Sequence, residues 1–262
     1  MNRIVYAILA LAALTSCANS YNIQGTSNVS MLDGRMLYLK VYQQDNMKNV
    51  DSCDVVHGQF HFTGTVDTTR MAILFMDDES IMPMVIEGGD ITIRLDNMQQ
   101  KVSGTPLNDK LTQFNDDYNK LQSRLNDLGH KQTQAIMNGD DEMETNRKLA
   151  AEADEIAQEE DKLVTSFIAE NFDNVLGPGV FFMITAGYQY PMLQPWIEDL
   201  WSKATDNFKN DAYVKNYYET ARENQEIMNG LRDAPQVQQP LPAQQPPVTP
   251  APTPNQLAAP VK

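Results

Sequence analysis

The chain of 262 residues is poor in basic side chains. It holds 20 lysine and arginine residues against 35 aspartate and glutamate residues, which gives a formal net charge of -15. A surface of this charge repels phosphate backbones and anionic lipid headgroups, and no cluster of lysine and arginine offsets the repulsion. The composition therefore argues against a nucleic-acid partner.

A long hydrophobic run is also missing at the N-terminus. The apolar stretch Ile4 to Leu14 has about ten residues, whereas a membrane-spanning helix needs roughly twenty. Arg3 precedes this stretch, and a basic residue followed by a short apolar segment is typical of a signal peptide. We therefore expect the first residues to direct export.

The apolar stretch ends in Leu14-Thr15-Ser16-Cys17, which resembles the lipobox of bacterial lipoproteins. In those proteins a small residue precedes a cysteine that is acylated and becomes the new N-terminus. The resemblance implies cleavage after Ser16 and a diacylated thioether with a further N-acyl chain on Cys17, which is enough lipid for stable anchoring. The alternative is an ordinary signal peptide in which Cys17 is a bystander.

Cysteine is scarce, because only Cys17 and Cys53 occur. If Cys17 carries lipid, Cys53 has no partner, and this excludes an intramolecular disulfide, a dithiol redox site and a thiolate zinc site. Cys53 lies between Asp51 and Asp54, whose charges disfavour the thiolate. We expect Cys53 to be a structural thiol in a strand.

Residues 21–104 show the short alternating patterns of strands. Phe60 and Phe62 alternate with polar residues, and so do Ile91, Ile93 and Leu95. Residue pairs that favour a positive φ predict tight hairpin turns between such runs. They are Asp33-Gly34, His57-Gly58 and Gly88-Gly89, with Asp77-Asp78-Glu79-Ser80 as a polar break of the same kind. We expect seven or eight antiparallel strands in a β-sandwich or small open barrel.

Residues 105–232 predict a helical part, which makes the chain an α+β protein. Thr105 before Pro106 is a favourable helix start. Apolar residues at spacings of three and four then predict the two legs of a long antiparallel helical hairpin, separated by Asn138-Gly139-Asp140. The first leg contains Leu111, Phe114, Tyr118, Leu121, Leu125 and Leu128. The second contains Leu149, Ile156, Leu163 and Phe167, with Ala153 and Glu160 at the weaker positions of the spacing.

Beyond the hairpin, Leu176-Gly177-Pro178-Gly179 predicts a further break, and a last helix is expected from about Asp211 to Leu231. Val180 to Ile184 is apolar all round and is expected to be buried. One cluster in this region is the candidate partner surface, because methionine and aromatic side chains adapt to partners. It contains Phe181, Phe182, Met183, Tyr188, Tyr190 and Met192. The alternative for this cluster is core packing.

The chain from Pro235 to its end has nine prolines and a single charged side chain, Lys262. Such a segment buries too little apolar surface to fold, so we expect an extended polyproline-like coil. The expected organisation is a signal peptide over 1–16, a lipidated N-terminus over 17–20, a β domain over 21–104, a helical domain over 105–232 and a tail over 233–262.

No arrangement of residues predicts a catalytic residue, a cofactor or a metal site. A glycine-rich phosphate loop, a serine nucleophile motif and paired zinc ligands are all missing from the sequence. His57 and His61 are four residues apart, but they flank a predicted turn and need not point the same way. The acidic residues Asp77 to Glu79 lack the spacing of a calcium loop.

Several segments are similar to one known family. They are Tyr21 to Gly25, Val50 to Ser52, His57 to Gly64, Val85 to Ile91, Val102 to Asn108 and, in the helical part, Phe167 to Asn171. These segments resemble a Bacteroidota lipoprotein domain of unknown function that usually precedes a thioredoxin-like domain in thiol-disulfide proteins. The likeness spans about Tyr21 to Asn224. It departs at Phe172, where a proline is usual, and at the tail, which stands in place of the redox domain, so no catalytic residue carries over.

Three functions follow as hypotheses. The first is a lipid-anchored, non-catalytic binding or interaction module that meets the membrane through Cys17 and meets an envelope protein partner. Ala18 to Tyr21 lack an acidic surface-export signal, which favours the periplasmic face of the outer membrane. The second is an accessory to periplasmic thiol-disulfide chemistry that docks a separate thioredoxin-like partner. The third is a hydrolase of envelope polymers that acts through scattered carboxylates.

Overall fold

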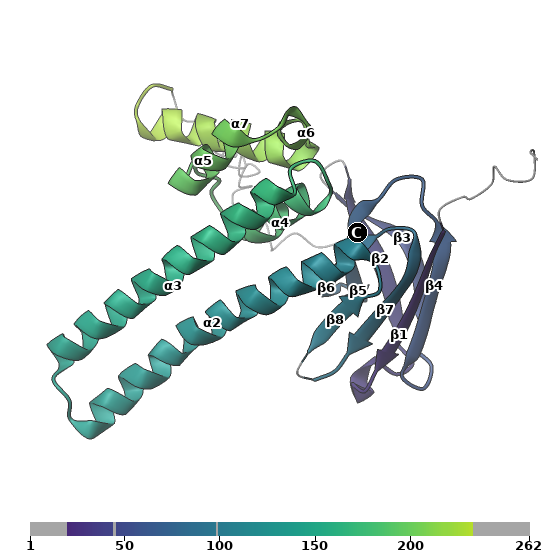
Figure 1. Cartoon of the computed structure of the whole chain (residues 1–262), viewed down its shortest axis with the longest axis horizontal. Coiled ribbons are helices and arrows are strands. Elements are labelled where there is room, and N and C mark those ends of the chain that lie inside the picture. The colour runs from purple at the N-terminus through teal and green to yellow at the C-terminus, as the bar shows by residue number, and fades with distance from the viewer. Residues whose placement is uncertain (1–19, 44–45, 98, 233–262) are drawn as a thin grey trace, which may run out of the picture.

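The structure is a computed structural model that describes residues 20–43, 46–97 and 99–232. The predicted signal peptide, Cys17 and the proline-rich tail lie outside these residues. The described chain folds as a β part followed by a helical part (Figure 1), so the predicted α+β class is confirmed. Among the described helices, none is long and apolar enough to cross a membrane.

The β part consists of two four-stranded sheets. Its strands are β1 (Ser20–Ser27), β2 (Met36–Gln43), β3 (Asn46–Asp54), β4 (Gln59–Thr65), β5 (Arg70–Met76), β6 (Glu79–Ile86), β7 (Gly89–Leu95) and β8 (Gln100–Ser103), with a short 3-10 helix, η1 (Ser30–Leu32), after β1. The strand orders are β4-β1-β7-β8 and β3-β2-β5-β6. One pair departs from the antiparallel expectation, because β1 and β7 run parallel.

Only three of the seven connections between the described strands are hairpins, and the other four pass from one sheet to the other. The hairpins predicted at Asp33-Gly34 and Gly88-Gly89 are therefore wrong, since these pairs link strands of different sheets. His57 and Gly58 do form a tight turn, with φ of 51° and 70°. The strands on either side of this turn then separate into different sheets. A residue pair that tolerates positive φ serves any sharp turn, and it does not show where the next strand goes.

The core of the β part lies between the two sheets. The alternating residues predicted to face inwards are buried there, among them Phe60, Phe62, Ile91, Ile93 and Leu95, each at most 4% exposed. Their polar neighbours in the same strands face solvent. The alternation therefore gave the correct face of each of these strands.

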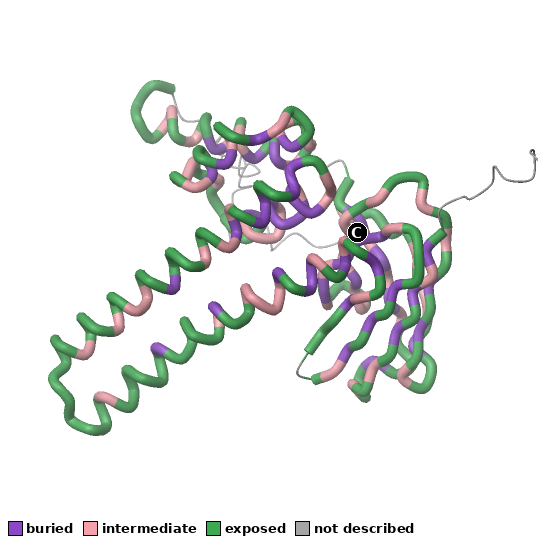
Figure 2. The backbone as a smooth tube through the Cα atoms, in the orientation of Figure 1, coloured by how far each residue is buried: buried purple, intermediate pink, exposed green. Residues whose placement is uncertain are grey.

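The helical hairpin consists of α2 (Pro106–Asn138) and α3 (Glu142–Glu170), as the spacing predicted. At 1.5 Å per residue, α2 is about 50 Å long. It ends at Gly139 in a left-handed conformation (φ 74°), and the Asp141 side chain accepts a hydrogen bond from the Glu144 N–H at the start of α3. The hairpin projects from the body (Figure 1), and its outer half is mostly exposed (Figure 2).

Leu125 does not belong to the buried seam, although its spacing predicted that it would. It is 39% exposed, whereas Leu121 and Leu128 pack against Ile156 on α3. The reason is that only two helices meet along this stretch, so only a narrow stripe of each is covered. Leu125 lies beside that stripe.

The remaining helices are α4 (Leu176–Thr185), α5 (Pro195–Lys203), α6 (Asp206–Lys209) and α7 (Ala212–Met228). The break predicted at residues 176–179 is wrong, because these residues form the first turn of α4. Proline is tolerated in a first turn, where the helix needs no N–H donor from it. Gly177 allows close packing, since a Cβ atom there would lie 2.4 Å from the carbonyl oxygen of Asn171.

A buried polar joint connects the start of α2 to the β part. Asn108 is fully buried, and its side chain accepts a hydrogen bond from the Val85 N–H (2.8 Å) and donates one to the Val85 carbonyl (2.8 Å). The Glu87 carboxylate accepts hydrogen bonds from the N–H groups of Leu107 (2.9 Å) and Asn108 (3.1 Å). Thr105 is at the N-cap position as predicted, but its hydroxyl accepts from the Asn108 side chain and does not cap the helix. Glu87 takes over that role.

Candidate functional site

A cavity lies between the β part and the helical part. We call it the interdomain groove, and its volume is about 840 Å³. The ends of β2 and β5 form one wall, and the α3–α4 connection, α4 and the α6–α7 region form the other. In Figure 1 this helical region stands beside one end of the sandwich. The joint at Asn108 and the packing of Met71 on β5 against the helical core both hold the two walls in place.

Three aromatic rings gather in the interdomain groove. The ring of Tyr42 on β2 lies 5.2 Å from Phe182 and 5.8 Å from Tyr213, and the last two are 4.8 Å apart. Burial raises the pKa of Tyr213, whose hydroxyl lies 3.1 Å from the Thr185 hydroxyl. We call Tyr42, Phe182 and Tyr213 the aromatic triad. It offers an apolar surface with hydroxyl groups, and such a surface suits ligands that are partly apolar and partly polar.

Side-chain amides surround the aromatic triad. Asn207, Asn210 and Asn216 line the helical wall and are exposed, and Gln43 lies on the opposite wall. The structure shows no hydrogen bond from these four side chains to another described residue. Each amide can donate and accept, so the groove can satisfy the carbonyl or hydroxyl groups of a bound molecule.

The charged side chains of the groove are balanced and already engaged. Two are cationic, Lys40 and Arg70, and two are anionic, Asp173 and Asp211. The Lys40 ammonium lies 4.3 Å from the centre of the Phe75 ring. Asp211 accepts from two N–H groups at the start of α7, and Asp173 accepts from a threonine hydroxyl. This balance suits a ligand without net charge.

The predicted partner surface does not exist as one patch. Phe181 is 2% exposed and packs in the helical core, so it is corrected to a core residue. Phe182 lines the groove, and Met183 is half-buried against the helical core. Tyr188, Tyr190 and Met192 are exposed after α4 and do not line the groove. The helix explains why Phe181, Phe182 and Met183 separate, because successive residues of α4 point in different directions. The other three residues lie beyond the end of this helix.

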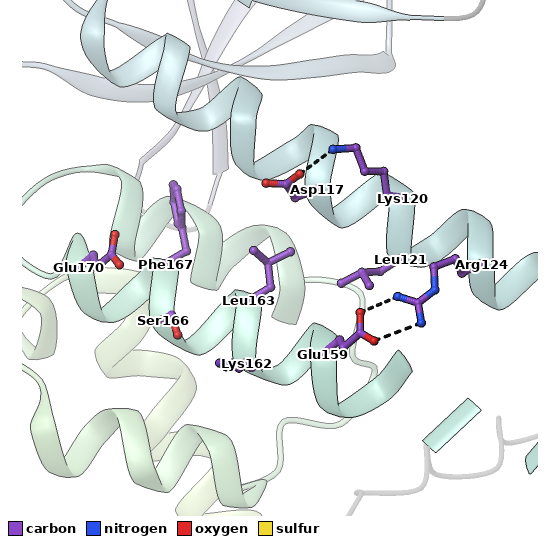
Figure 3. Close-up of a pocket in the computed structure, with 10 residues that line it drawn as sticks. All are labelled: Asp117, Lys120, Leu121, Arg124, Glu159, Lys162, Leu163, Ser166, Phe167 and Glu170. Atoms are coloured by element: carbon purple, nitrogen blue, oxygen red, sulfur yellow. Dashed lines mark hydrogen bonds and ion pairs between the residues drawn. The ribbon is translucent and has the colours of Figure 1, made fainter. Parts of the chain in front are cut away.

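A second cavity of about 690 Å³ lies between α2 and α3 (Figure 3). Four of its six charged residues pair with one another: Arg124 donates two hydrogen bonds to Glu159, and Lys120 donates one to Asp117. These hydrogen bonds lower the pKa of Glu159 and of Asp117. The cavity is thus an open crevice in which most charges are already paired, and it has no cluster of aromatic rings like that of the interdomain groove, which is the better candidate site.

Cys53 lies in β3 and is a free, half-buried thiol. Burial is the main cause that raises its pKa to about 11, and the charges of Asp51 and Asp54 add to this, while a backbone hydrogen bond with His61 opposes it. The sequence correctly predicted that the thiolate of Cys53 is disfavoured. It named the two neighbouring carboxylates as the cause, whereas burial has the larger effect on the pKa. A thiol of this kind is a poor nucleophile.

The two histidines and the acidic turn serve local structure. His57 occupies a turn, and a ring nitrogen of His61 lies 2.6 Å from the side-chain oxygen of Asn22. Asp77 has a φ of 53° in the β5–β6 turn and forms an ion pair with Arg35. Within the part of the chain that the structure describes, no group of three or more histidine, cysteine or acidic side chains could hold a metal ion.

Sequence reasoning missed most of the groove. Of the aromatic triad it singled out Phe182 alone, and it singled out none of the asparagines. These residues come from segments far apart in the chain, and they follow no shared spacing. The weak signal that could have found them is the density of asparagine between residues 207 and 216.

Comparison with known proteins identifies a class of domain for the β part. Residues 21–111 match the family described as Domain of unknown function (DUF4369). The expected resemblance to such a domain is therefore confirmed for these residues, which include the joint at Asn108 and exclude most of the helical part. No curated protein and no solved structure matches the chain.

Proposed function

We propose that this chain is a lipid-anchored cell-envelope lipoprotein that acts as a non-catalytic binding module, with the interdomain groove as its binding site. The observation that carries the proposal is the combination of the aromatic triad with uncommitted side-chain amides in a groove of about 840 Å³. Ligand sites are typically concave, of roughly 300–1,000 Å³, with apolar walls and a few polar groups.

The position of the proposed anchor supports an envelope ligand. Cys17 precedes Ser20, the first residue of β1, by three residues, which span at most about 10 Å when extended. Ser20 pairs with Thr65 at the end of β4, and the next segment leads to Arg70 in the groove. A lipid on Cys17 would therefore hold the groove close to the membrane, on the periplasmic face of the outer membrane in our proposal.

Affinity capture from envelopes with matched variants tests the binding site. Asn216→Arg places a long cationic side chain in the groove, and Gln225→Arg places the same side chain elsewhere on α7. Both positions are exposed, so both variants should fold like the wild type. We expect at least one envelope component to be retained by wild type and Gln225→Arg and lost with Asn216→Arg. Identical sets for all three proteins would rule out the groove as the site.

The second proposal is an accessory role in periplasmic thiol-disulfide chemistry, in which the module docks a separate thioredoxin-like protein. The resemblance described above supports it, while the raised pKa of Cys53 makes a direct thiol role unfavourable. Co-purification of a thioredoxin-like protein with both wild type and Cys53→Ser would favour docking without chemistry. If no such protein co-purifies and the thiol state of envelope proteins is unchanged, the proposal fails.

A further inference from the structure

We infer that the interdomain groove takes a proline-rich segment in the polyproline II conformation, and that its occupant is this chain's own tail, residues 235–262. This inference rests on the proposed function of the groove as a binding site. It also gives a role to the proline-rich segment of the sequence.

The aromatic triad has the chemistry that proline-rich segments need. Proline-rich peptides dock in grooves lined with aromatic side chains, and they lose little entropy because their extended conformation is already formed. Tyr42 is 37% exposed, and its ring meets Tyr213 edge-on at 88° and Phe182 at 37°. Rings set at such angles form ridges and hollows between which proline rings can pack.

The amides of the groove supply what a polyproline II helix lacks. This conformation has no internal hydrogen bonds, so its carbonyl groups need outside donors. The side chains of Asn207, Asn210 and Asn216 line one wall and form no hydrogen bond with a described residue, and Gln43 lies on the other wall. Donors on both walls could hold an extended segment that runs along the groove.

The charges of the two parts are compatible. Residues 235–262 contain no acidic side chain and one basic side chain, Lys262. The groove has two cationic and two anionic side chains, and all four already have partners. An almost uncharged segment therefore enters without burying an unpaired charge.

The tail is also long enough to reach the groove. Tyr213 and Asn216 lie in the first turns of α7, which has 17 residues and is thus about 25 Å long. The segment Pro247-Val248-Thr249-Pro250 has prolines three apart, which is one turn of polyproline II. About 14 residues separate it from Arg232, and at about 3.1 Å per residue they span roughly 45 Å. This span is greater than the length of α7, which the tail must pass to return to Tyr213 and Asn216.

Photo-cross-linking of the full mature chain tests the inference. A photo-reactive residue replaces Val248, and the cross-linked residues are mapped by mass spectrometry in wild type, Asn216→Arg and Gln225→Arg. We expect cross-links to the segments that contain Tyr42 and Tyr213, reduced at least fivefold by Asn216→Arg and unchanged by Gln225→Arg. The inference would be overturned by cross-links spread over the whole folded body, or by an equal yield of groove cross-links in Asn216→Arg and Gln225→Arg.

Two further measurements separate the alternatives. Mixing isotopically light and heavy chains shows whether the tail binds its own chain, and cross-links between light and heavy copies would contradict that assignment. Titration with maltoheptaose, a neutral oligosaccharide, tests the other ligand class: binding that Asn216→Arg abolishes, without tail cross-links, would overturn the tail inference. The proposed function would stand in that case, whereas it fails only if Asn216→Arg changes no binding at all.

Discussion

The side-chain amide of Asn108 forms two hydrogen bonds, each of 2.8 Å, with the backbone of Val85. Val85 belongs to β6, an outer strand of its sheet, and the Val85 N–H and carbonyl that bond to Asn108 lie on the edge that no strand covers. The amide thus pairs with β6 as a neighbouring strand would, and it fixes the start of α2 at the sheet edge. Because α2 leads to the rest of the helical part, this contact helps to set the geometry of the interdomain groove, together with the packing of Met71 against the helical core.

Replacing Asn108 should destabilise the protein strongly. Asn108→Leu has a similar volume but leaves two buried backbone groups of Val85 unpaired, at about 1–3 kcal/mol each. We expect a loss of about 3 kcal/mol in the free energy of unfolding, measured by urea denaturation. Asn126→Leu is the matched control, since Asn126 is exposed on the same helix and its replacement should cost less than about 0.5 kcal/mol. Equal effects would show that the joint does not hold α2.

The helical hairpin depends on Ile156. Ile156 is fully buried between the legs, so Ile156→Ala should cost about 3 kcal/mol through lost contacts and a cavity. Leu125→Ala removes a leucine that is 39% exposed, and we expect a cost below about 1 kcal/mol. Thermal unfolding of both variants checks the difference. If Leu125→Ala lost more stability than Ile156→Ala, Leu125 would belong to the buried seam after all, as the spacing predicted.

The thiol of Cys53 should react slowly in the native protein. Its pKa of about 11, against an ordinary value of 9.0, lowers the thiolate population near neutral pH about 100-fold. The rate of alkylation by iodoacetamide should therefore rise with pH up to about 11 and should be much faster in urea. Native and unfolded protein reacting at the same rate at pH 8 would contradict this burial of Cys53.

Stability should fall when the pH rises above 10. Burial and a hydrogen bond to Asp51 raise the pKa of Tyr21 to about 12, and burial and a hydrogen bond to Glu160 raise that of Tyr118 to about 12, both from 10.0. The unfolded state then loses these protons first, so the free energy of unfolding decreases between pH 10 and 12. Tyr118→Phe should reduce the slope, and the same substitution at Tyr190, which is 70% exposed, is the matched control. A slope that Tyr118→Phe leaves intact would argue against the burial of this hydroxyl.

Sequence patterns predicted the parts of the fold that depend on local periodicity. Alternation gave the inward faces of β4 and β7, and the spacing of apolar residues gave both legs of the hairpin with its turn at Gly139. These features follow from the direction in which successive side chains point. The pairing of β1 with β7 could not be predicted in this way, because turn residues do not show which sheet the next strand joins.

Local sequence patterns could not predict the interdomain groove or the joint at Asn108 either, because both depend on contacts between segments that are far apart in the chain. The segments around Val85 and Asn108 were noted as separate stretches of turn and strand residues, yet in the structure they form one contact. The aromatic triad combines residues from β2, α4 and α7, and only the folded chain brings them together. Phe181 and Phe182 illustrate the limit, since adjacent residues of one apolar stretch divide between the core and the groove.

Intact-mass spectrometry of the native protein, purified from the envelope of its source, tests the central claim of an anchored module most directly. The predicted mass is that of a chain that begins at Cys17 and carries a diacylglyceryl group and one further acyl chain. A chain that retains residues 1–16, or that carries an unmodified thiol or a disulfide at Cys17, would contradict the account.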